Sequence, residues 1–93
     1  MNNEAIKMHR GQPFKKAEIL AVGDVVWCTF YDINHGKSWL EGPYFVLECK
    51  HEGKMSEHWT LFSTHEKRHH KARIQDIWVP IIEKIDPPRG NNE

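Results

Sequence analysis

Residues 22–32 read VGDVVWCTFYD, and this stretch decides the fold class. It is rich in β-branched and aromatic residues, and its apolar positions lack the three- and four-residue spacing of an amphipathic helix. The stretch therefore predicts a β-strand. Because successive side chains of a strand point to opposite faces, such a strand has two different sides. One side would carry Val26, Cys28 and Phe30, and the other Val25, Trp27, Thr29 and Tyr31.

Similar stretches follow toward the C-terminus, separated by residues that favour turns. Residues 34–37, 42–43 and 51–54 interrupt the apolar pattern with Asn, Gly and Pro, which adopt turn conformations readily. For 69–74 a helix competes with a strand, and the strand is favoured because the segment has no apolar stripe for a helix to bury. In chain order, the predicted elements are strands at 44–50, 58–63, 69–74 and 81–85, with a 3₁₀ turn at 75–78.

Five short strands joined by tight turns, with a 3₁₀ turn before the last, are typical of a small Src-homology-3-like barrel. Closing the sheet also removes exposed edges, and 93 residues allow one such domain. The predicted boundaries are a flexible lead-in at 1–12, a single β-barrel domain at 13–88 and a disordered tail at 89–93. So small a core supplies limited stability, which makes a homodimer plausible. The predicted core residues are Val26, Phe30, Phe45, Leu47, Leu61, Ile74, Ile77 and Ile82.

Composition excludes several classes of protein. Hydrophobic residues make up 39% and charged residues 28%, as in folded soluble domains. No apolar run approaches the roughly 20 residues of a membrane span, and the N-terminal residues contain no apolar secretion signal. Cys28 and Cys49 lie 21 positions apart with no second cysteine beside either, so they predict neither a zinc ribbon nor a redox pair. Two free thiols are in keeping with a cytoplasmic location.

The sequence offers little for catalysis or for a cofactor. It contains no nucleophile elbow, no phosphate-binding loop and no paired metal-ligand motif. His65 and His69 have a spacing that would bring two imidazoles together on a helix, but three cationic side chains in the same stretch would repel a divalent ion. We therefore predict a non-catalytic protein without a metal or another cofactor. Protonation near pH 6 would make the histidine-rich segment more positive.

Charge is balanced overall, with 13 basic and 13 acidic residues, but it is segregated along the chain. Residues 1–16 and 65–73 each carry a net charge of +3, whereas 17–64 carries −4. Solvated charge runs are the simplest explanation, but a basic strand on an acidic body also fits a phosphate backbone. We predict a binding module for nucleic acid, RNA above all. The candidate binding residues are the basic Lys67, Arg68, Lys71 and Arg73 and the aromatic Trp27, Tyr31 and Trp59.

Two runs carry a family resemblance: GDVVW at 23–27, followed by Asp32 and Gly36, and GPYFVL at 42–47. Together they resemble the opening of the MazF/PemK-type toxins, over residues 22–64. The resemblance implies a small barrel that dimerises and cleaves single-stranded RNA.

In that family an arginine stands immediately before the proline that opens the second strand, and it takes part in cleavage. Gly42 occupies this position here, whereas Ser63 or Thr64 matches the family's hydroxyl residue after the third strand. The family's C-terminal helix has no counterpart in the predicted pattern. The opening at 22–27 is equally similar to KOW and Tudor-like modules, which bind RNA or protein without chemistry. A shared barrel does not transfer function.

Two alternatives to RNA binding stay open. One is a protein-interaction module, including a small inhibitor that occupies the surface of a host enzyme, with the acidic middle segment and exposed aromatic residues as its interface. The other is a divergent MazF/PemK-like endoribonuclease that lacks the usual arginine. Such an enzyme would lose RNA cleavage when Ser63 or Thr64 is changed.

Overall fold

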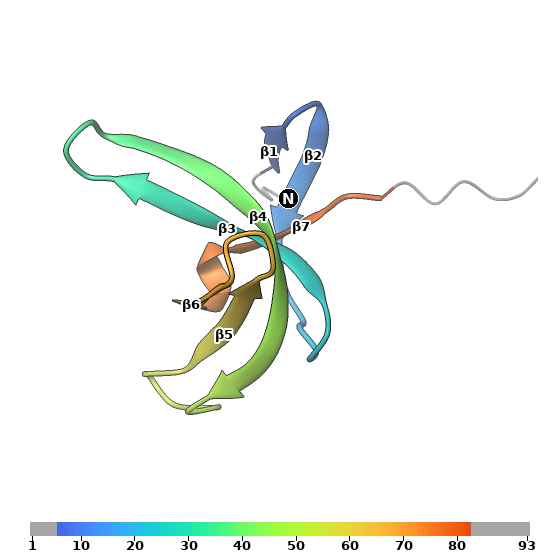
Figure 1. The fold of residues 1–93 in the computed structure, drawn as a ribbon, viewed down its shortest axis with the longest axis vertical. Helices are drawn as coiled ribbons and strands as arrows, with labels where there is room; N and C mark the ends of the chain where they lie inside the picture. The colour runs from blue at the N-terminus through green and yellow to red at the C-terminus, as the bar shows by residue number, and fades with distance from the viewer. Residues whose placement is uncertain (1–5, 83–93) are drawn as a thin grey trace, which may run out of the picture.

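Seven strands and one short 3₁₀ helix make up the regular structure of residues 6–82, the part of the chain that the computed structural model describes (Figure 1). The elements are β1 (Ile6–His9), β2 (Gln12–Lys16), β3 (Val25–Asp32), β4 (Lys37–Lys50), β5 (His58–Ser63), β6 (Arg68–Ala72), η1 (Ile74–Asp76) and β7 (Ile77–Pro80). These residues are mainly β, as predicted, and they contain no α-helix. The long β3–β4 hairpin projects away from the other strands (Figure 1).

The strands form one antiparallel sheet in the order β1-β2-β7-β3-β4-β5-β6. The last strand, β7, pairs with both β2 and β3 and so joins the N-terminal hairpin to the rest of the sheet. Because β1 and β6 stand at the two ends of this order, the sheet formed by the described residues is not closed. The predicted closed barrel of five strands is therefore not confirmed.

The two strands that were not predicted form a hairpin at the N-terminal side of the sheet. Arg10 and Gly11 form the turn between β1 and β2. Residues 6–12 thus belong to a β-hairpin, although they fall within the predicted flexible lead-in at 1–12. This hairpin is held by the pairing of β2 with β7 and by the burial of Phe14, which are long-range contacts that the local pattern does not reveal.

The C-terminal strand lies earlier in the chain than predicted. β7 ends at Pro80, and η1 begins one residue before the predicted 3₁₀ turn. Of the strand predicted at 81–85, residues 81 and 82 are not in a strand, and residues 83–85 lie outside the described part of the chain. The described part of the chain ends at residue 82, so the predicted domain boundary at 88 and the predicted tail at 89–93 lie outside it.

β4 differs most from the prediction, because the side predicted to face the core faces outward and the opposite side faces the core. It is a single strand that passes through Gly42-Pro43, where a break between two elements was predicted. Tyr44 and Val46 face the core, while Phe45 and Leu47 are 38% and 39% exposed, so the prediction of these two as core residues is wrong. The pairing of Val26 with Tyr44 sets which side faces inward, and a bulge between Val46 and Glu48 shifts the register afterwards.

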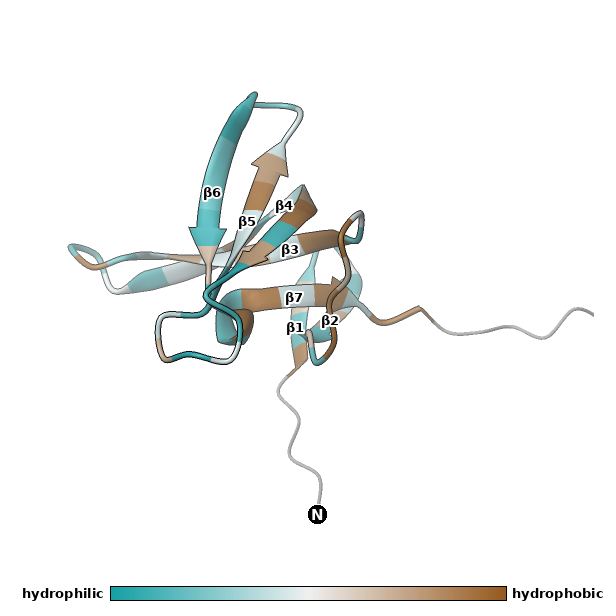
Figure 2. Cartoon of the chain, turned by 90° about the horizontal axis from the view of Figure 1, so that it is seen from below, coloured by the Kyte–Doolittle hydropathy of each residue, from teal (hydrophilic) through white to brown (hydrophobic). Residues whose placement is uncertain are grey.

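Two clusters of buried side chains form the core. The larger consists of Ala17, Val26, Cys28, Tyr44, Val46, Leu61, Ala72 and Ile77, and the smaller of Phe14, Leu40 and Trp78. Of the other predicted core residues, Phe30 and Ile74 are half-buried, and Ile82 is 78% exposed. Ile82 was misplaced because the last strand ends before it. Figure 2 shows the resulting contrast between the largely apolar β7 and the hydrophilic β6.

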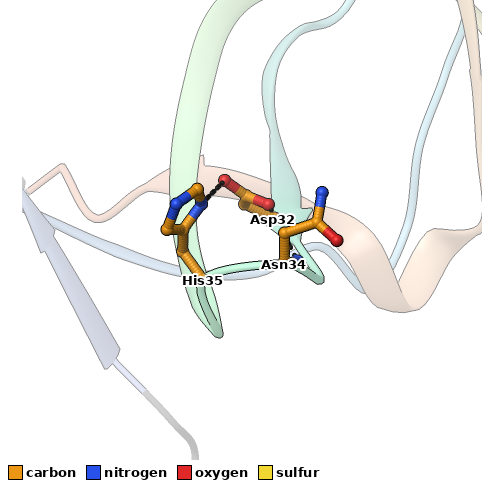
Figure 3. Close-up of polar contacts among 3 residues, drawn as sticks. All are labelled: Asp32, Asn34 and His35. Carbon is orange, nitrogen blue, oxygen red and sulfur yellow. Dashed lines mark hydrogen bonds and ion pairs between the residues drawn. The ribbon is translucent and has the colours of Figure 1, made fainter.

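The tip of the β3–β4 hairpin is shaped by one carboxylate (Figure 3). Asp32 accepts a hydrogen bond from the backbone N–H of Asn34 at 3.0 Å, and its other oxygen lies 2.8 Å from Nδ1 of His35. Gly36 follows with a φ of 63°, which suits glycine. The predicted turn at 34–37 is therefore confirmed, and local side-chain bonding explains it.

Candidate nucleic-acid interface

The four predicted cationic residues lie on or beside β6, at one edge of the sheet. Lys67 occupies the turn before β6 with a φ of 56°, and Arg68 opens the strand. Arg68 forms an ion pair with Glu66, with Nε 2.7 Å from Oε1. Lys71 and Arg73 are exposed, and within residues 6–82 neither they nor Lys67 form an ion pair. These three cations are therefore available to a ligand.

The three predicted aromatic residues are not brought together. Trp27 packs against the smaller core cluster, with its ring centroid 4.9 Å from that of Phe14. Trp59 packs against the larger cluster, and its indole N–H is buried without a hydrogen-bond partner in the described chain. Tyr31 is 62% exposed, but it lies near the tip of the β3–β4 hairpin. Trp59 does not face the same surface as Lys71, because the two side chains have opposite orientations on paired strands.

A different set of rings lies on the outward side of β4, β5 and β6. Phe45 is paired with Phe62, and Phe62 with His69, so the three side chains stand side by side across adjacent strands. The ring centroids of Phe62 and His69 are 5.0 Å apart. Phe45 and His69 are exposed and Phe62 is half-buried. We call Phe45, Phe62 and His69 the outer row.

Lys71 belongs to the same surface as the outer row. It follows His69 by two residues in β6, and it is paired with Thr60, which in turn is paired with Glu48. The direct neighbour of Lys71 on this face is therefore the uncharged Thr60. Glu48 forms an ion pair with Lys50, with Nζ 3.6 Å from Oε2. The surface therefore combines aromatic rings with a cation that has no acidic partner among the described residues.

Sequence reasoning missed two members of the outer row for different reasons. Phe62 could have been found, because placing Leu61 in the core makes its neighbour face outward. Phe45 could not, because the face of β4 depends on its pairing with β3 and on the bulge. In β6 the side chains alternate as in a strand with one inward face: Ala72 is buried, His70 is half-buried, and their neighbours are exposed.

The inward side of the sheet gathers the groups with shifted pKa values. His70 packs between Phe30 and Tyr44, with ring centroids 4.8 and 5.9 Å away. Burial lowers the pKa of His70, and nearby Arg68 lowers it further. Burial raises the pKa of Tyr44, and the Glu41 carboxylate raises it further. Burial also raises the pKa of the core thiol, Cys28, to about 12, so this thiol stays protonated at neutral pH.

His70 should make folding stability depend on pH. The fold favours the neutral ring, whereas the unfolded chain protonates it near the ordinary pKa of 6.5. The stabilising contribution is therefore complete above pH 6.5 and is lost as the pH falls through the lower pKa of the folded state. Urea denaturation should show a small decrease in the free energy of unfolding from pH 7.5 to 5.5, reduced in His70→Phe and retained in His69→Phe. An equal decrease in His70→Phe would contradict this.

A small cavity of about 290 Å³ lies beside this inward cluster. Gly42, Ser63 and His65 are among the residues that line it. The hydroxyl of Ser63 is buried and accepts a hydrogen bond from the backbone N–H of Glu66 at 3.1 Å, which gives it a structural role in the β5–β6 turn. A Cβ atom at position 42 would lie 2.6 Å from Cδ1 of Trp27, so the arginine implied by the resemblance would require Trp27 to move.

Among residues 6–82, no three His, Cys, Asp or Glu side chains are grouped as metal ligands. The same residues include no helix with the length and hydropathy needed to cross a membrane. No protein-family model, no curated protein and no solved structure matches the chain.

Proposed function

We propose that this protein is a non-catalytic module that binds single-stranded nucleic acid, with RNA as the favoured ligand. The observation that carries the proposal is the outer row, in which three adjacent strands present Phe45, Phe62 and His69 side by side. Bases of a single strand stack on such rings, and each stacked base contributes about 1–3 kcal/mol. Because every base has an aromatic face, this binding tolerates many sequences.

The cations of β6 supply the electrostatic part of the proposed interface. Lys71 stands next to the outer row, and Lys67 and Arg73 flank the strand without ion pairs among the described residues. Phosphates of a strand stacked on the row would pass this edge of the sheet. Each neutralised phosphate of a single strand contributes about −0.7 to the slope of log K against log salt concentration.

We also propose that five of the strands correspond to a Src-homology-3-like arrangement. The order β7-β3-β4-β5-β6, with η1 immediately before β7, supports this because the last strand returns to pair with the first of the five. The β1–β2 hairpin is then an addition at the edge of β7.

Removing a ring from the outer row should weaken RNA binding without unfolding the protein. Phe45→Ala changes a side chain that is already partly exposed, and it should lower the affinity for a single-stranded RNA by about 5–100-fold, since one stacking contact is lost. Fluorescence anisotropy with a labelled oligonucleotide measures the effect, and thermal melting checks the fold. Tyr31→Ala is the matched control, because it removes an exposed ring that lies near the tip of the β3–β4 hairpin, outside the row.

The same titration separates the proposed function from its alternatives. Equal affinity of wild type and Phe45→Ala would contradict stacking on the outer row. No RNA binding even at low salt would leave the row as the interface of a protein partner. Cleavage of the RNA that disappears in Thr64→Ala would instead favour a ribonuclease.

A further inference from the structure

A larger cavity of about 580 Å³ shares Glu41, Gly42 and Pro43 with the smaller one and lies between the β1–β2 turn, β3, β4 and the end of β7. None of the outer-row residues lines it. Its interior is apolar and aromatic: Phe14 and Leu40 are buried, and the ring of Trp27 stands at an interplanar angle of 63° to that of Phe14. Pockets of this size and composition are typical of sites for small molecules.

Long-range hydrogen bonds hold the walls of this cavity in place. Gln12 donates from Nε2 to the carbonyl oxygen of Ile81 at 2.9 Å, and the N–H of Ile81 donates to the carbonyl oxygen of Pro13 at 2.8 Å. These bonds fasten the chain after β7 to β2, so that Pro80 and Ile82 form one wall. The cavity is therefore built by tertiary contacts.

The charged groups of the lining are unevenly placed. His9 and Arg10 come from the β1–β2 turn, and Arg10 forms no ion pair within residues 6–82. The acidic member of the lining, Glu41, is paired with Cys28, and its carboxylate accepts a hydrogen bond from Nε1 of Trp39 at 2.9 Å. The cation without an ion-pair partner among the described residues thus belongs to the β1–β2 turn, whereas the carboxylate belongs to β4, and Arg10 favours a ligand with a negative group.

The backbone of Arg10 gives a second reason to assign it a role. Arg10 and Gly11 have φ values of 55° and 81° in a two-residue hairpin turn. Turns of this kind favour Asn, Asp or Gly at the first position, because other side chains are strained there. Strained residues are concentrated at ligand-binding sites. An arginine in this position is therefore better explained by a ligand than by the turn.

We propose that the cavity binds a planar aromatic ring joined to a phosphate, the chemistry of a nucleoside monophosphate. The ring would lie against Trp27, which is held in place by Phe14, and Arg10 would hold the phosphate through charge-assisted hydrogen bonds. This site is separate from the outer row and does not depend on the function proposed for it.

Adenosine 5′-monophosphate is a suitable probe, titrated into the protein while the backbone and indole N–H signals are followed by NMR. We expect the signal of Trp27 to shift, with binding at least tenfold weaker for adenosine, which lacks the phosphate, and for ribose 5-phosphate, which lacks the ring. Arg10→Asn suits the turn, so it should keep or raise the melting temperature while lowering the affinity at least tenfold. Lys15→Asn, on the same hairpin but outside the cavity lining, is the matched control and should bind as the wild type does.

Three results would overturn this assignment. One is the absence of binding at millimolar nucleotide. Another is unchanged affinity in Arg10→Asn, and the third is a set of NMR shifts confined to the outer row. Each of them leaves the test of RNA binding by Phe45→Ala unaffected.

Discussion

Reversing Lys71 and Arg73 to glutamate should lower the affinity for single-stranded RNA by about 100-fold or more at physiological salt. Both side chains are exposed, and neither has an acidic partner among the described residues. The double variant would remove two of the proposed phosphate contacts and place two negative charges beside the outer row. The slope of log K against log salt should become less steep by about 1.4, since each contact contributes about 0.7. Anisotropy titrations at several salt concentrations measure both quantities.

The control for this variant must change the net charge equally at another place. Lys15→Glu with Lys37→Glu meets this condition, because Lys15 lies in β2 and Lys37 at the tip of the β3–β4 hairpin. We expect this control to retain most of the affinity and most of the slope. If both double variants lose affinity alike, the RNA is attracted by net charge alone and β6 is not its binding site.

Replacing Gly42 by alanine should destabilise the fold by about 1–3 kcal/mol, the usual cost of overpacking a core. The added Cβ would lie 2.6 Å from Cδ1 and 2.7 Å from Cγ of Trp27. Because Cγ is bonded directly to the Cβ atom of Trp27, the contact cannot be relieved by moving only the far end of the side chain. For a domain of this size, each kcal/mol lowers the melting temperature by about 4–8 °C. Thermal and urea denaturation measure the loss, with Ser38→Ala on the same strand as a neutral control.

A double-mutant cycle identifies the cause of this loss. If the clash with Trp27 is responsible, Gly42→Ala should cost less in a Trp27→Leu background, because the branched side chain leaves room for the new methyl group. Gly42→Arg, which introduces the residue that the toxin resemblance implies, should destabilise at least as much as Gly42→Ala. A Gly42→Arg variant as stable as the wild type would mean that this position tolerates the family's arginine after all.

The strands that could be predicted from the sequence are those whose pattern is local. β5 is found at the predicted residues, and β3 and β6 are found with shifts of a few residues, because alternation and turn residues determine a strand wherever it pairs. The net positive charge of residues 65–73 could also be obtained directly from the sequence. By contrast, Arg10-Gly11 is not a typical hairpin turn, and β1 and β2 contain few apolar residues, so their hairpin had no local signal.

The faces of the strands and the composition of the candidate site depended on tertiary structure. Alternation shows that neighbouring side chains point in opposite directions, but it does not say which direction is inward. The pairing of Val26 with Tyr44 and the bulge after Val46 decide this for β4, and they turn Phe45 outward beside Phe62. Trp27 and Trp59, which looked like surface residues, are instead packed against the two core clusters. Residue types and their spacing thus identified the strands and the basic segment at 65–73. The register of the paired strands determined which aromatic rings stand beside that segment.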